Sequence, residues 1–129
     1  MSLNGSFHPP GDKSLSHRIA LMSLLAQGEC RVANFSPCAD VASSIHMIRL
    51  LGVGAEVEGG ELILGGPGIT KRQPMDLDCG NSGTTMRLGM GILVGRPGGF
   101  ILDGGVGIPD EAKPENVIAM YQFAKECVY

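Results

Sequence analysis

The chain has 129 residues and is 43% hydrophobic, which is enough for one domain with a buried core. Its formal net charge is −3 and it contains no tryptophan, so its composition excludes binding to nucleic acid through an overall positive field. We expect no signal peptide and no membrane segment, because no stretch approaches the roughly 18 apolar residues of a membrane span, and hence a cytoplasmic protein. The four cysteines form no C-x-x-C pair, so we expect small buried apolar residues or idle thiols and no metal site.

The first part of the chain predicts a helix, a strand and a second helix. Apolar residues at helical spacing predict a helix over 14–26, which Gln27-Gly28 ends: Leu15, Ile19, Met22 and Leu25. The alternating stretch 29–35 predicts a strand. Ser36-Pro37 predicts the start of the second helix, which carries Asp40 in its first turns and ends at Gly52.

Glycines and short apolar runs predict strands in the middle of the chain. Residues 55–57 and 61–64 predict a hairpin around Gly59-Gly60, followed by a loop over 65–74. Residues 75–78 then predict a short strand. The number of strands is low for a sheet that is stable by itself.

A third helix and a fourth follow. Asn81 or Ser82 predicts the cap of a helix over 83–94, in which Leu88 and Ile92 are core candidates. Residues 100–102 predict a strand, and Pro114 predicts the start of a last helix, whose apolar positions are Val117, Tyr121, Ala124 and Val128.

The order of these elements predicts an α/β (α+β) fold made of βαβαββ-type units. Residues 11–74 resemble one such unit without its opening strand, and 75–129 resemble a second, diverged or truncated unit, within one partial domain over 1–129. An incomplete unit leaves open sheet edges, and association of identical chains is one way to cover them.

Residues 11–18, GDKSLSHR, predict an anion site at the start of the first helix. Free backbone N–H groups point outward there, and Lys13 and Ser14 add a charge and a hydroxyl. Arg18 lies four residues beyond Ser14 on the same face, where its guanidinium can hold a phosphate or carboxylate through two hydrogen bonds. The spacing is not that of a P-loop, and a solvated polar helix start stays open as the alternative. His17 alone indicates a surface residue or one that supports the site from behind.

Residues 78–87, DCGNSGTTMR, repeat this arrangement at the third helix. A strand end leads through a glycine turn and small polar residues into a helix, and Gly83 allows a ligand to approach the backbone closely. Arg87 lies four residues further on, on the face of the turn. The two stretches together predict two neighbouring anion sites, or one site shared by a doubly anionic substrate; a capped helix with a tight turn is the alternative.

GDKSLSHR and LDCGNSGTTMR resemble the signature stretches of the 5-enolpyruvylshikimate-3-phosphate synthases (3-phosphoshikimate 1-carboxyvinyltransferases), and the resemblance extends over about 11–102. It implies about one and a half to two units, an incomplete domain, of a two-domain fold in which each domain has three βαβαββ units. It implies an enzyme that transfers enolpyruvyl from phosphoenolpyruvate to shikimate 3-phosphate, toward chorismate and aromatic amino acids, without metal or organic cofactor.

The same resemblance implies a role for each matching residue. Lys13, Ser14 and Arg18 would bind shikimate 3-phosphate, and Lys13 would also contact phosphoenolpyruvate. The phosphoenolpyruvate pocket would be lined by Asn81 and Gly83 and supported by Arg87. The expected partners are therefore these two small anionic substrates.

The resemblance ends after about Leu102. The family continues to an Arg-Pro pair, whereas this chain reads ILDGGVGIPDEAKPEN, with Lys113-Pro114 out of register. The family's second domain, which supplies acid/base carboxylates and a catalytic lysine, has no counterpart here. We therefore expect the N-terminal part of an enolpyruvyl transferase, inactive alone. A non-catalytic anion-binding or self-assembling module is the alternative, and the GDKS-x-SHR wording argues against the sister enzyme that acts on a UDP-sugar.

Overall fold

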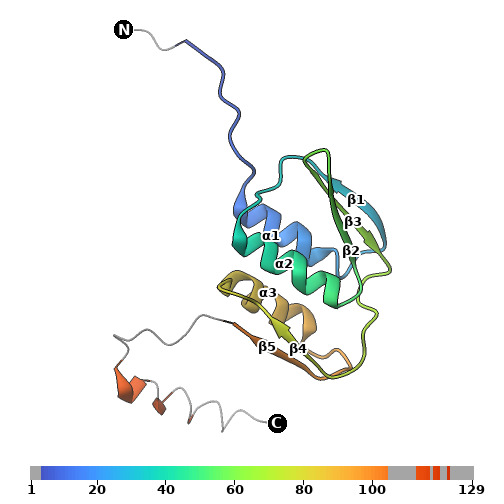
Figure 1. The fold of residues 1–129 in the computed structure, drawn as a ribbon. Helices are drawn as coiled ribbons and strands as arrows, with labels where there is room; N and C mark the ends of the chain where they lie inside the picture. Colours follow the sequence, from blue (N-terminus) through green and yellow to red (C-terminus); the bar gives the residue numbers. More distant parts are fainter. Residues whose placement is uncertain (1–3, 105–112, 117, 120–121, 123–129) are drawn as a thin grey trace.

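The computed structural model describes residues 4–104, 113–116, 118–119 and 122, and the elements follow the order expected from the sequence (Figure 1). The helices are α1 (Lys13–Met22), α2 (Ala39–Leu50) and α3 (Gly83–Leu93). The strands are β1 (Gly28–Val32), β2 (Gly54–Glu58), β3 (Glu61–Gly66), β4 (Met75–Asp78) and β5 (Phe100–Asp103). Residues 114–116 are helical, and most of the helix expected beyond Pro114 lies outside the described residues.

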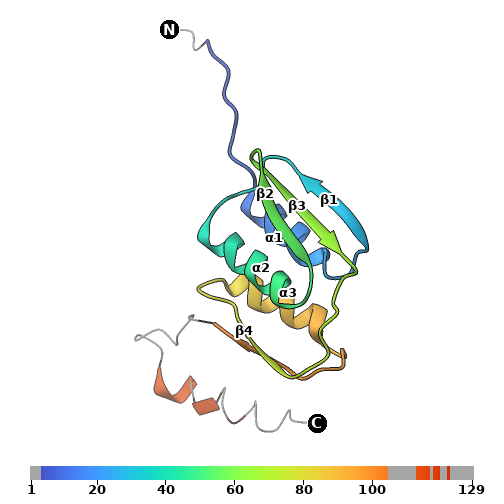
Figure 2. The ribbon, with the colours of Figure 1, turned by 45° about the vertical axis from the view of Figure 1, so that its right-hand side comes forward.

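Two small sheets flank the helices. β1, β3 and β2 form an antiparallel sheet in that order, in which Leu64 of β3 lies opposite both Cys30 and Ala55. β4 and β5 pair in parallel, with Leu77 opposite Leu102, and α3 makes the crossover between them. The helices therefore lie between the antiparallel sheet and the parallel pair, as Figures 1 and 2 both show. The mixed α/β fold predicted from the sequence is confirmed.

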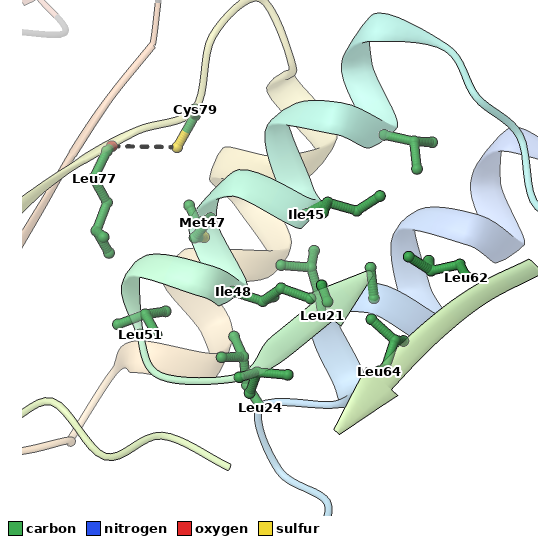
Figure 3. Packing of buried hydrophobic residues seen from close by; sticks show 14 of the residues in the cluster. Leu21, Leu24, Ile45, Met47, Ile48, Leu51, Leu62, Leu64, Leu77 and Cys79 are labelled. Atoms are coloured by element: carbon green, nitrogen blue, oxygen red, sulfur yellow. Dashed lines mark hydrogen bonds between the residues drawn. The ribbon is translucent and has the colours of Figure 1, made fainter. Parts of the chain in front are cut away.

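The hydrophobic core fills the space between the helices and the antiparallel sheet, and extends under β4 (Figure 3). Ile48 of α2 packs among leucines of α1 and β3, and Met47 lies on the side facing β4. At the edge of the core, the Cys79 thiol lies 3.7 Å from the Leu77 carbonyl oxygen, to which it donates. The side chains that are at most 1% exposed include Leu21, Leu24, Met47, Ile48, Leu51, Leu62, Leu64 and Leu77.

The apolar spacing noted on the first helix marks its outer face. Leu15 is 57% exposed and Met22 is 57% exposed, whereas Ala20 and Leu21 are buried. The buried face also carries Ser16 and His17. Small side chains at Ser16 and Ala20 allow neighbouring backbone to approach closely. The buried face of the helix is therefore one residue further along than the apolar stripe. On α3 the core candidate Leu88 is likewise wrong, because it is exposed, while Ile92 packs against the core.

Two elements end at least three residues earlier than expected. α1 ends at Met22 instead of residue 26, because the amides of residues 24–26 bond to carbonyls three residues back and tighten the chain into a turn. β1 ends at Val32 instead of residue 35, because Asn34 adopts a left-handed conformation with φ 53°. None of the described helices is long and apolar enough to cross a bilayer.

Candidate anion-binding site

All three helices begin at the same end of the molecule. In Figure 1 the first residues of α1, α2 and α3 lie together, below the N-terminal segment. The side chain of Lys13 in α1 pairs with Asp40 in α2, and a Cβ added at Gly80, just before α3, would lie 2.6 Å from the Ser43 hydroxyl of α2. Three N-terminal helix dipoles therefore converge, which favours the binding of negative charge at this end.

The start of α1 is fixed by its own cap and by the segment that leads into α2. Asp12 Oδ1 accepts a hydrogen bond of 2.6 Å from the Leu15 backbone N–H, as an N-cap does. The Ser16 hydroxyl donates to the Asp12 carbonyl at 2.7 Å and accepts from the Ser36 backbone N–H at 2.9 Å. Gly11 lies against the backbone of residues 34–35, where a Cβ would come within 1.8 Å of the Asn34 carbonyl oxygen. These contacts hold the helix start in one position.

Lys13 is paired at the mouth of the site. Its ammonium donates to the Asp40 carboxylate; the Lys13 side chain is 53% exposed, and that of Asp40 is half-buried at 32%. The hydrogen bond from Lys13 lowers the pKa of Asp40, and the hydrogen bond to Asp40 raises the pKa of Lys13. The ammonium of Lys13 is open to solvent, so an incoming anion can compete with the Asp40 carboxylate for it.

The other expected anion ligands on α1 are exposed and available. Ser14 and Arg18 both face solvent, four residues apart on one helix face. Within residues 4–104, Arg18 forms no ion pair with an acidic side chain. The structure thus brings Lys13, Ser14 and Arg18 to the exposed side of α1, as the sequence predicts.

The start of α3 offers a second set of exposed groups. Ser82, not Asn81, is the cap: its Oγ accepts the Thr85 backbone N–H at 3.1 Å. Gly80 has φ 53°, which suits glycine, and its N–H donates to Asp78 Oδ1 at 2.7 Å. Asn81 is exposed, and no atom lies within 4 Å of the place where a Cβ on Gly83 would stand. The open space above Gly83 leaves its backbone accessible to a ligand.

Arg87 completes this second set. It follows Gly83 by four residues on α3 and is exposed, and among the described residues it pairs with no acidic side chain. Both stretches singled out in the sequence therefore present a helix start with an arginine one turn further on, at the same end of the molecule.

His17 lies behind the site and is 1% exposed, so the prediction of a surface residue is wrong and that of a supporting residue fits its position. Its Nδ1 is 2.7 Å from Ser44 Oγ, which is 2.7 Å from Thr85 Oγ1, which donates to Ser82 Oγ at 2.7 Å. This buried network of His17, Ser44, Thr85 and Ser82 joins α1, α2 and α3. The separation of its members in the sequence, 27 and 41 residues for the first two links, explains why no local pattern revealed it.

We predict that stability falls in acid as His17 takes up a proton in the unfolded chain. Burial, followed by the charge of Lys13, lowers the pKa of His17 below its ordinary 6.5, against the opposing charge of Asp40. Above pH 6.5 both states are neutral and the full stability is present; as pH falls below 6.5, the unfolded state binds the proton first and stability is lost. Urea unfolding at a series of pH values from 8 to 5 checks this. His17→Asn should flatten this part of the curve, and an unchanged slope in that variant would contradict the assignment.

An apolar cavity lies elsewhere among the described residues and is unsuited to anions. A groove of about 410 Å³ runs between the exposed face of α1 and the antiparallel sheet, and its walls include Ile19, Met22, Leu25, Val53 and Leu64. Arg18 lies at its border, where the apolar groove meets the helix starts. Because these walls are mostly apolar, the exposed helix starts, and not this groove, form the candidate site.

The cysteines and acidic residues show no sign of a metal centre in the part of the chain that the structure describes, where no three ligand side chains gather. Cys79 is buried as expected for a small apolar residue, whereas Cys30 is exposed and Cys38 is half-buried at the cap of α2. The nearby backbone N–H of Val41 lowers the pKa of Cys38, with a smaller effect of the Lys13 charge. The lowered pKa is a further sign that negative charge is favoured at these helix starts.

Comparison with known proteins gives a consistent result. A model of the family described as EPSP synthase (3-phosphoshikimate 1-carboxyvinyltransferase) matches residues 1–110. The 3-phosphoshikimate 1-carboxyvinyltransferase of Bacillus velezensis is 50% identical over 98 residues, and that of Bacillus subtilis is 47% identical. An EPSP synthase structure from Acinetobacter baumannii superposes with a TM-score of 0.69 at 31% identity, over 90% of this chain. The chain spans 23% of the length of the Bacillus velezensis relative and 27% of the Acinetobacter chain.

Proposed function

The chain belongs to the EPSP synthase family, and from this membership we propose that the converging helix starts form one wall of a site for shikimate 3-phosphate and phosphoenolpyruvate. The observation that carries the proposal is the meeting of three helix N-termini with two exposed arginines and an exchangeable lysine. Both substrates carry a phosphate, and phosphoenolpyruvate also carries a carboxylate. Helix N-termini, guanidinium groups and an ammonium are the groups that bind such anions.

Each residue has a proposed role in this wall. Ser14 and Arg18 bind the phosphate of shikimate 3-phosphate, the hydroxyl as a single donor and the guanidinium through two N–H groups. Lys13 leaves Asp40 and lies between the two anions. The open backbone at Gly83, with Asn81 and Arg87, receives phosphoenolpyruvate. Together these groups would stabilise the negative charge that develops on the transferred group and its phosphate.

We expect no turnover by the 129-residue chain alone. Enolpyruvyl transfer needs a proton donor and acceptor, and the carboxylates of Asp12 and Asp78 at these helix starts already accept hydrogen bonds from backbone N–H groups. Exclusion of water, which strengthens the electrostatic interactions with the reacting groups, also needs a second wall over this exposed face. A coupled assay of phosphate release with both substrates checks this expectation, and turnover that an Arg18→Ala variant lacks would contradict it.

Binding of shikimate 3-phosphate tests the proposal directly. A titration followed by amide NMR shifts should give changes centred on Lys13, Ser14 and Arg18. Arg18→Ala should weaken binding by about tenfold to a hundredfold, because a hydrogen bond to a charged group contributes about 1.5–3 kcal/mol. Arg31→Ala is the matched control, because Arg31 is an exposed arginine that pairs with Glu29 on β1, away from the helix starts. If no shifts appear at millimolar ligand, the proposed site fails and the non-catalytic, self-assembling module becomes the better interpretation.

A further inference from the structure

The positions of the hydrogens in the buried network can be worked out by counting donors and acceptors. The network consists of His17, Ser44, Thr85 and Ser82. Each of the four side chains is at most 2% exposed, and Ser44 and Thr85 are fully buried. Ser82 Oγ accepts two hydrogen bonds from Thr85, one from the backbone N–H at 3.1 Å and one from the hydroxyl at 2.7 Å. A threonine hydroxyl has one hydrogen, so Thr85 has none left for another partner.

The remaining hydrogens follow from this step. Ser44 Oγ lies 2.7 Å from Thr85 Oγ1 and must be the donor in that pair. The Ser44 oxygen then offers only a lone pair to His17, so His17 Nδ1 donates to it at 2.7 Å. His17 Nε2 is buried and meets no hydrogen-bond partner among the described residues, so a second ring hydrogen at that position would have no acceptor. The ring is therefore neutral, with its hydrogen on Nδ1.

We propose that His17 is a positioning residue, whose Nδ1–H orders the Ser44 and Thr85 hydroxyls and so holds the N-cap of α3 in place against α1 and α2. The hydrogen bonds run in one direction, from His17 through two hydroxyls to Ser82, and Ser82 fixes the first turn of α3. The anion-binding stretch of α1 thereby controls the geometry of the stretch on α3. His17 itself contacts neither anion.

The consequence for the substrates rests on the proposed function. Removal of the Nδ1–H leaves Ser14 and Arg18 intact, but it frees the hydroxyls that hold the start of α3. Phosphoenolpyruvate affinity should then fall, although no residue that touches a substrate has been changed. Shikimate 3-phosphate affinity should change much less, because its proposed ligands lie on α1.

Two variants separate the hydrogen bond from the volume of the side chain. His17→Asn keeps an N–H donor that can reach Ser44, and His17→Leu fills similar space without a donor. In the unchanged chain, long-range ¹H–¹⁵N correlation of the His17 ring at neutral pH should show the hydrogen on Nδ1. A ring with its hydrogen on Nε2 would overturn the inference.

Amide hydrogen exchange then distinguishes local positioning from loss of core packing. The Thr85 amide reports on the cap of α3, and the Val53 amide, which bonds to the Ile48 carbonyl at 3.0 Å, reports on the core beyond α2. His17→Leu should speed exchange at Thr85 about tenfold more than at Val53, and His17→Asn should restore the rate at Thr85. Equal acceleration at both amides, or none at Thr85, would overturn the inference.

Titration of the substrates distinguishes the positioning role of His17 from the proposed function. Titration of phosphoenolpyruvate in the presence of shikimate 3-phosphate should show about tenfold weaker binding to His17→Leu than to His17→Asn. If the unchanged chain binds neither substrate while the ring and exchange results hold, the proposed function fails and the positioning role stands. If both variants bind phosphoenolpyruvate equally, the positioning role is overturned and the proposed function stands.

Discussion

Gly11→Ala is expected to destabilise the chain by about 3 kcal/mol, the upper end for overpacking, because the added methyl group has no space. It would come within 1.8 Å of the Asn34 carbonyl oxygen and 2.6 Å of the Phe35 carbonyl carbon, and both belong to backbone, which cannot rotate away as a side chain can. The start of α1 would have to move from the segment 34–36. Urea unfolding measures the loss, and titration of shikimate 3-phosphate should show weaker binding in the same variant.

Gly91→Ala is the matched control for this effect. Gly91 lies within α3, and nothing lies within 4 Å of its added Cβ. An alanine in an exposed helix position favours the helix over glycine, so this variant should gain about 0.5–1 kcal/mol. If Gly11→Ala unfolds at the same urea concentration as the unchanged chain, the close approach of Gly11 to residues 34–35 is wrong.

Leu21→Ala should cost about 3 kcal/mol, whereas Leu15→Ala on the same helix should change stability by less than about 1 kcal/mol. Leu21 is 1% exposed and lies in the core between α2 and the antiparallel sheet, and its truncation leaves a cavity. Leu15 is 57% exposed on the outer face, so its truncation removes few contacts.

The two variants are well matched, because both residues are leucines of the same helix and differ only in the face on which they lie. Chemical unfolding of both variants measures the difference in the free energy of unfolding. Equal losses would mean that the stripe of Leu15, Ile19 and Met22 packs inward, contrary to the structure. A net stability of about 5–15 kcal/mol for a typical domain makes a difference of this size easily measured.

Most of the helix and strand positions could be predicted from the sequence, because caps and breakers act locally. Ser82 caps α3, Gly52 follows the end of α2, and Gly59-Gly60 turns the hairpin between β2 and β3. The end of β1 was misjudged, because the left-handed conformation of Asn34 depends on how the segment packs against Gly11. The buried face of α1 does not follow from the sequence for a similar reason: periodicity identifies an apolar stripe, but the neighbouring elements decide which stripe is buried.

The candidate site also has a part that the sequence predicts and a part that only the tertiary structure shows. GDKSLSHR and CGNSGTTMR contain residue types suited to anions, spaced one helix turn apart. This part could be predicted, because a helix start and a side chain four residues later share a face by helix geometry alone. The pairing of Lys13 with Asp40 and the network from His17 to Ser82 join residues from different helices, and only the tertiary structure brings them together. The sequence by itself determined which charged and hydroxyl groups stand at each helix start. The packing of three helices between two sheets decided that these starts meet at one end, with a buried histidine behind them. Such contacts join residues that are far apart in the sequence, so they leave no local pattern.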